Sequence, residues 1–101
     1  MSCDALLLNK GSCILFEVGF TDGGNAPIDI TDDVLSVQDA SVTTLEGMVI
    51  TKSDPVNGIA SIFLNEVDAA GIPEGISSSF RIGRDDGNGI ITTNKIWVNH
   101  K

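Results

Sequence analysis

Turn-forming residues recur about every ten residues along this chain and separate short apolar runs. The runs are rich in Ile, Val, Thr, Ser and Phe, whereas Gly, Asp and Asn lie between them. β-Branched and aromatic side chains favour strands, and no segment carries a convincing helical period. The spacing therefore predicts an all-β sandwich or barrel of short antiparallel strands. We expect about seven strands, at residues 4–8, 13–20, 34–40, 45–52, 58–64, 76–84 and 89–98.

The chain has 101 residues, which suffices for one modest core and leaves no room for a second domain. We expect a single β-sandwich domain over residues 1–101. The alternation of apolar and polar residues within the strands selects the side chains that face inward. The predicted core consists of Leu7, Ile14, Phe16, Val18, Val37, Ile50, Ile62, Leu64, Phe80, Ile82 and Val98.

The richest turn sequence lies at residues 22–27, between two strand-like runs. Gly23 and Gly24 tolerate positive φ, and Asn25 can hydrogen-bond its own backbone. Pro27 fixes its own φ and pushes the preceding residue into an extended conformation. These residues predict a loop, and an ordinary hairpin connection is its simplest interpretation.

Two further segments have a predictable local structure. Residues 85–89 predict a hairpin, because Gly87 and Gly89 adopt left-handed conformations easily. This acidic turn superficially resembles a calcium loop, but its oxygen ligands do not alternate and no Glu closes it. Residues 66–70 support at most one helical turn, which Asn65 would cap.

The charge of the chain argues against a nucleic-acid partner. The net charge is -8, and the six Lys and Arg are spread along the whole sequence. A groove that follows phosphates needs clustered cations, so we expect no nucleic-acid binding. The longest apolar runs are also far too short for a bilayer or a signal peptide. We therefore expect no membrane association and no export signal.

The only cysteines are Cys3 and Cys13. A hairpin that turns at residues 9–11 would place Cys3 opposite Glu17, which disfavours a disulfide. We expect two free, partly buried thiols, in agreement with a reducing cytoplasm.

The sequence offers no catalytic constellation. The single histidine, His100, lies next to the C-terminus, where we expect a frayed surface residue. The Ser and Thr residues have no internal histidine to activate them, and neither acidic turn has the spacing of metal ligands. We therefore expect no catalytic residue, no metal and no cofactor. Tyr is absent and Trp97 is the only Trp, which weakens a carbohydrate-binding interpretation.

The order of these segments resembles small immunoglobulin-like β-sandwich proteins of tailed bacteriophages, which occur as tail, baseplate or neck components. The matching segments, in order, are the acidic Gly-rich turn that leads into 27–31, the run 58–64, the linker 67–75 and the final hairpin that ends in 96–98. Two positions depart from the pattern. Asp32 stands where Gly often follows the Thr, and Ser residues occupy 77–79, where aromatic residues are common.

The resemblance implies an immunoglobulin-like antiparallel sandwich with a non-enzymatic, structural role in a multimeric virion. Its partners would be other virion proteins, in a homo-oligomeric ring or trimer that assembles in the bacterial host cytoplasm. An accessory module that binds a carbohydrate or the host surface is the alternative. Alternation does not settle which face Trp97 occupies, and an outward-facing Trp favours an interface. The expected interface residues are Gly23, Gly24, Asn25, Pro27 and Trp97.

Overall fold

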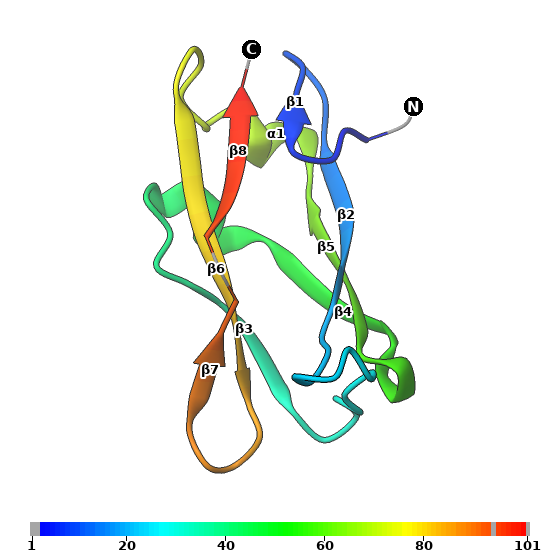
Figure 1. Ribbon diagram of the computed structural model, residues 1–101. Helices are drawn as coiled ribbons and strands as arrows, with labels where there is room; N and C mark the ends of the chain where they lie inside the picture. Colours follow the sequence, from blue (N-terminus) through cyan, green and yellow to red (C-terminus); the bar gives the residue numbers. More distant parts are fainter. Residues whose placement is uncertain (1–2, 94, 101) are drawn as a thin grey trace.

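Two β-sheets pack face to face around one hydrophobic core in a computed structural model, which describes residues 3–93 and 95–100 (Figure 1). The strands are β1 (Leu7–Leu8), β2 (Ile14–Gly19), β3 (Val34–Gln38), β4 (Val49–Asp54), β5 (Ile59–Leu64), β6 (Ser77–Asp85), β7 (Ile90–Thr92) and β8 (Ile96–His100). Short helical turns occur at η1 (Thr43–Gly47), η2 (Pro55–Asn57) and α1 (Glu66–Ala69). The predicted all-β sandwich is confirmed, with eight strands among the described residues instead of about seven.

The smaller sheet has the order β2-β5-β4 and is antiparallel throughout. The larger sheet has the order β1-β8-β6-β3, and β7 also pairs with β6. In Figure 1 the long β6 runs the length of one layer, while β2, β5 and β4 form the other. The two layers are in contact through the rings of Phe16 in β2 and Phe80 in β6. These rings are tilted relative to each other, and their centroids lie 6.1 Å apart.

Three expected strands differ markedly from the structure in their extent. The run at 4–8 forms a strand only at Leu7–Leu8. The run at 45–52 begins as the helical turn η1, because Leu45 is completely buried and anchors it against the core. The run at 89–98 divides into β7 and β8. Its ladder with β6 is interrupted where the Ile82 N–H donates to the hydroxyl of Thr93 (3.1 Å), which takes the place of a backbone acceptor.

The two local predictions near the ends of the strands are confirmed. The Asn65 side chain caps α1 by accepting the backbone N–H of Asp68 at 2.8 Å. The hairpin between β6 and β7 contains Gly87 at φ 96° and Gly89 at φ 130°, which are the left-handed positions that favour glycine.

Most of the predicted core lies inside the sandwich. The fully buried members are Ile14, Ile62, Leu64, Phe80, Ile82 and Val98. Half-buried members that pack against them are Phe16, Val18, Val37 and Ile50. The prediction that Leu7 belongs to the core is wrong, because Leu7 is 52% exposed and Leu8 is buried in its place. The sequence alternation also missed buried residues, most of them in loops and turns, namely Phe20, Ile30, Leu45, Met48, Ala60, Ala69 and Ile72.

The N-terminal segment explains the error at Leu7, because it is not the hairpin partner of β2. Asp4 forms a parallel bridge with Ile14, in which the Asp4 N–H donates to Cys13 and the Leu15 N–H donates to Asp4. The chain then crosses to the other sheet, where β1 pairs in parallel with β8. A parallel pairing of the two ends of the chain sets a different register from a local hairpin.

The prediction of two free thiols is wrong, because Cys3 and Cys13 form a disulfide with 4.7 Å between their Cα atoms. An antiparallel hairpin would have placed Cys3 opposite Glu17. The parallel bridge at the next residue instead brings Cys3 beside Cys13. The cysteines therefore give no support to a reducing compartment.

We expect Cys3 and Cys13 to stay unlabelled when the denatured, unreduced protein is treated with a maleimide, and both to be labelled after reduction. Mass spectrometry measures the number of labels. The variant Cys3→Ser is the control, because it frees Cys13 for labelling without a reductant. Labels on the denatured, unreduced wild-type chain would contradict the disulfide.

The prediction that His100 is a frayed surface residue is also wrong, because His100 is buried at the end of β8. Its Nδ1 donates to the carbonyl of Ile72 at 2.7 Å, and its own carbonyl accepts the N–H of Gly75 at 2.8 Å. These two hydrogen bonds hold the loop before β6 against β8, so His100 has a structural role.

Candidate interaction surfaces

The loop at 22–27 is exposed, and both the carboxylate and the backbone of Asp22 hold its shape. Asp22 Oδ1 accepts the N–H groups of Gly24 (2.8 Å) and Ala26 (3.0 Å). The left-handed residue is Asn25, at φ 63°, and not Gly23 or Gly24. The predicted loop residues therefore form a fixed, solvent-facing turn.

Trp97 is half-exposed on the outer face of the larger sheet, opposite Ser79 in β6. The Lys95 ammonium lies 5.7 Å from the centroid of the indole, within the range of a cation–π contact. The structure does not bring Trp97 and the loop at 22–27 together. Trp97 belongs to β8, whereas the loop follows β2 in the other sheet.

An apolar row crosses the outer face of the smaller sheet. Phe63 in β5 lies directly opposite Leu15 in β2 and Val49 in β4. All three side chains are exposed, and Phe63 also lines a shallow depression with Cys13 and Glu66. Exposed apolar side chains that are contiguous across a sheet favour contact with another molecule. Sequence alternation placed these residues outside the core but gave no sign that they align.

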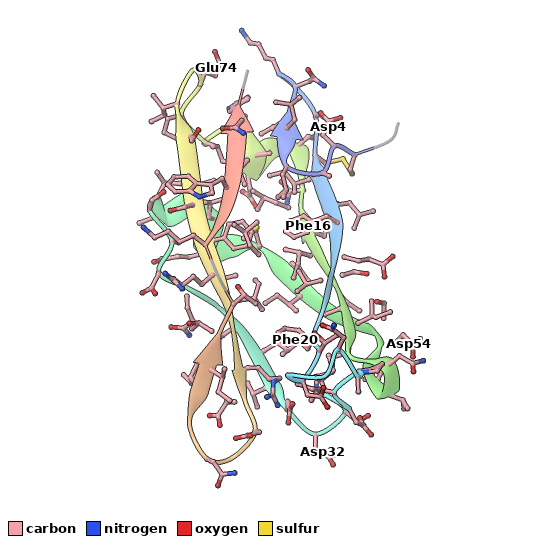
Figure 2. All side chains as sticks on the ribbon, in the orientation of Figure 1. Asp4, Phe16, Phe20, Asp32, Asp54 and Glu74 are labelled. Carbon is pink, nitrogen blue, oxygen red and sulfur yellow. A yellow bond between two sulfur atoms is a disulfide. The ribbon has the colours of Figure 1, made fainter. Side chains whose placement is uncertain are left out.

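One end of the sandwich is strongly acidic. Figure 2 shows Asp32 and Asp54 at this end, with the β6–β7 hairpin beside them, and Asp4 and Glu74 at the other. Half of the chain's 14 acidic residues belong to its loops and strand ends, namely Asp22, Asp29, Asp32, Asp33, Asp54, Asp85 and Asp86. This arrangement gives the end a negative potential that attracts cationic groups.

Asp29 at this end stays ionised to unusually low pH. The hydroxyl and the backbone N–H of Thr31 both donate to Asp29 Oδ1, at 2.5 Å and 2.9 Å. These bonds stabilise the carboxylate, so they hold the pKa of Asp29 below its usual value. The negative charge at this position therefore persists to a lower pH than that of an unperturbed Asp.

A cavity of about 350 Å³ opens between the two sheets at the acidic end. Phe20 and Ile28 line one wall, and Ile91 and Arg84 line the other. Arg84 Nη1 donates to Asp33 Oδ2 at 2.8 Å, and the two side chains are only 11% and 10% exposed. The ion pair neutralises the arginine inside the sandwich, where an unpaired charge would be strongly destabilising.

Sequence reasoning missed this cavity, because its walls are far apart in the chain. One signal was present in the alternation of β6. Arg84 lies on the same side of the strand as Phe80 and Ile82, which are buried. A cation on the apolar side of a strand predicts a buried partner, and Asp33 is that partner.

Two further observations concern the described residues. In residues 3–93 and 95–100, no helix has the length and apolar character needed to cross a membrane. Within the same residues, no three or more His, Cys, Asp or Glu side chains are grouped so that they could hold a metal ion.

Comparisons with known proteins gave no relative for this chain. No family model, no curated protein and no solved structure matches it.

Proposed function

We propose that this protein is a non-enzymatic structural component of a tailed-phage virion, in the tail, baseplate or neck, and that it acts through contacts with other proteins. The observation that carries the protein-binding part is the exposed row of Leu15, Phe63 and Val49 across one sheet. Such a row is stabilised when another molecule covers it. The half-exposed Trp97 on the opposite sheet adds a second surface, because Trp is enriched at the centres of interfaces.

The assignment to phage proteins rests on the resemblance of the sequence to immunoglobulin-like virion proteins. The strand orders β2-β5-β4 and β1-β8-β6-β3 support it. Immunoglobulin constant-type domains place their first, second, fifth and fourth strands in one sheet and their third, sixth and seventh in the other. Strands two to seven have the same arrangement here if β7 and β8 are taken as two halves of the seventh strand, whereas β1 departs from it by pairing with β8 in the larger sheet.

The proposed partners are other virion proteins and further copies of this chain, in a ring or a trimer. Two sheet faces with exposed apolar groups would let one copy contact neighbours on opposite sides. The proposed location is the virion, assembled in the host cytoplasm. The Cys3–Cys13 disulfide suits a particle that meets an oxidising medium after release.

The carbohydrate-binding alternative is less well supported. A sugar platform needs an open aromatic face. The ring of Trp97 already has the Lys95 ammonium over it. A glycan array separates the two functions, because the proposal expects no signal for the native protein and the alternative expects one.

We expect Trp97→Ala to impair assembly more than folding. An interface Trp contributes about 2 kcal/mol or more to binding, so incorporation into virions should fall about tenfold or more. The melting temperature should change by less than about 4 °C, since the indole is half in water. The measurements are the amount of the protein in purified virions of the phage that encodes it and thermal unfolding of the isolated chain.

The matched control for Trp97→Ala is Val56→Ala, which trims an exposed apolar side chain in η2. This variant should incorporate normally. If Trp97→Ala instead unfolds the chain and the remaining folded protein incorporates normally, Trp97 serves the fold and not an interface.

A further inference from the structure

The N-terminal segment closes only part of the gap between the two sheets. Asp4 pairs with β2 at Ile14, and β1 pairs with the last residues of β8. Beyond this point the described residues give β2 no strand on its outer edge, since the sheet order begins with β2. We use the name seam for the cavity that Gly19 of β2 and Ile91 and Thr92 of β7 line, together with the outer edges of these two strands. Phe16 and Val18 face the core but stay half-buried, in agreement with an opening beside them.

Both walls of the seam direct backbone groups into it. The Leu15 N–H donates away from β5, to Asp4, and the Phe20 N–H donates toward β5, to Gly58. Because these directions alternate along an antiparallel strand, the N–H and C=O of Glu17 and Gly19 point out of the sheet edge. These are the groups with which an added strand would pair.

The opposite wall, β7, follows the same rule. The Thr93 N–H donates to Ile82 in β6 at 3.0 Å. The alternation then turns the backbone groups of Ile91 toward β6 and those of Ile90 and Thr92 away from it. The side chain of Ile91 lines the cavity of about 350 Å³ that forms part of the seam.

The charge around the seam selects the occupant. Asp22 and Asp86 lie in the loops at its acidic end, Asp85 ends β6, and Glu17 lies on β2 itself. Arg84, the cation that lines the cavity, is already paired with Asp33. An incoming segment therefore meets carboxylates and apolar surface together. Electrostatic complementarity favours Lys or Arg on either side of an aliphatic residue.

We propose that the seam binds an extended, basic segment of a partner protein, which adds a strand to the edge of β2 or β7 and places one aliphatic side chain in the cavity. The occupant is thus a strand and not a folded surface. This inference goes beyond the proposed function. It concerns a surface that contains neither Trp97 nor the row of Leu15, Phe63 and Val49, and it holds whether or not the protein belongs to a virion.

The probe is a synthetic peptide of the sequence Lys-Thr-Val-Thr-Ile-Thr-Val-Thr-Lys, added to the intact, isotope-labelled protein. We expect amide NMR shifts and slowed hydrogen exchange at Glu17, Gly19, Ile90 or Thr92. A peptide with Glu in place of both Lys should bind about tenfold more weakly or not at all. Shifts that map to another surface, or no shifts, would overturn the proposal.

Two pairs of variants test the mode of binding. Asp32→Lys should weaken binding of the basic peptide several-fold, whereas Glu74→Lys, the same charge change at the opposite end, should not (Figure 2). Thr92→Pro removes an outward N–H from β7 without removing a bond to β6, and Gly19→Pro does so on β2. At least one of these two folded variants should bind about tenfold more weakly. If one fails to fold, as thermal unfolding would show, the other decides.

A second copy of the chain is the competing occupant. Shifts at the same four amides that grow with protein concentration in the absence of peptide would show self-association through the seam. That result would overturn the proposal that the occupant is a basic segment of a partner protein. Unchanged binding in both proline variants would overturn strand addition.

Discussion

The variant Phe80→Ala should lower the free energy of unfolding by about 3 to 5 kcal/mol. Phe80 lies in the middle of β6, is completely buried, and contacts Phe16 of the opposite sheet. Its removal takes away transfer free energy and leaves a cavity between two sheets that cannot collapse onto each other easily. Urea unfolding, followed by tryptophan fluorescence, measures the change.

Phe63→Ala is the matched control, because it removes the same ring from the outer face of β5. The ring is 38% exposed and its removal leaves no closed cavity, so the loss should be smaller than for Phe80→Ala, about 1 to 2 kcal/mol. A loss of less than about 1 kcal/mol for Phe80→Ala would contradict the burial of the ring and the register of β6 against β8.

The sequence predicts the central strands well because their pattern is local. Ile62 and Leu64 in β5, and Phe80 and Ile82 in β6, are apolar residues two positions apart, so alternation assigns them to one face, and all four are buried. The turns are equally local, since glycine or Asn supplies their special φ values. Such features depend on a few neighbouring residues.

The N-terminus could not be predicted in the same way. Its register depends on β8, about 90 residues away, and on a parallel bridge that a short loop does not suggest. The errors at Leu7, at the Cys3–Cys13 pair and at His100 share this origin, because all three lie where the two ends of the chain meet. The positions of these residues depend on pairing between strands that are far apart in the sequence, and a local sequence pattern carries no information about such pairing.

The candidate surfaces show the same difference between features that depend on local sequence and features that depend on long-range pairing. The loop at 22–27 is exposed as expected, and Trp97 faces outward, which alternation had left open. The seam and the Arg84–Asp33 pair join residues from distant parts of the sequence. Only Arg84 among them carried a local sign, a cation on an apolar strand face.

Gly58→Ala should destabilise the protein by about 2 to 5 kcal/mol. Gly58 has φ +72°, where an L side chain costs about 1 to 2 kcal/mol. An added Cβ would also lie 2.6 Å from the carbonyl oxygens of both Phe20 and Ile28. These are backbone atoms that no rotamer change can move aside, so overpacking adds about 1 to 3 kcal/mol. Urea unfolding measures the total.

Gly75→Ala separates the two contributions, because Gly75 has nearly the same conformation, φ +78°, and nothing within 4 Å of an added Cβ. It should show only the conformational cost, about 1 to 2 kcal/mol. Equal losses in the two variants would contradict the close approach at Gly58. The difference also bears on the seam, since Phe20 and Ile28 line its cavity. If Gly58 holds that wall in place, the folded fraction of Gly58→Ala should bind the basic peptide more weakly than Gly75→Ala does.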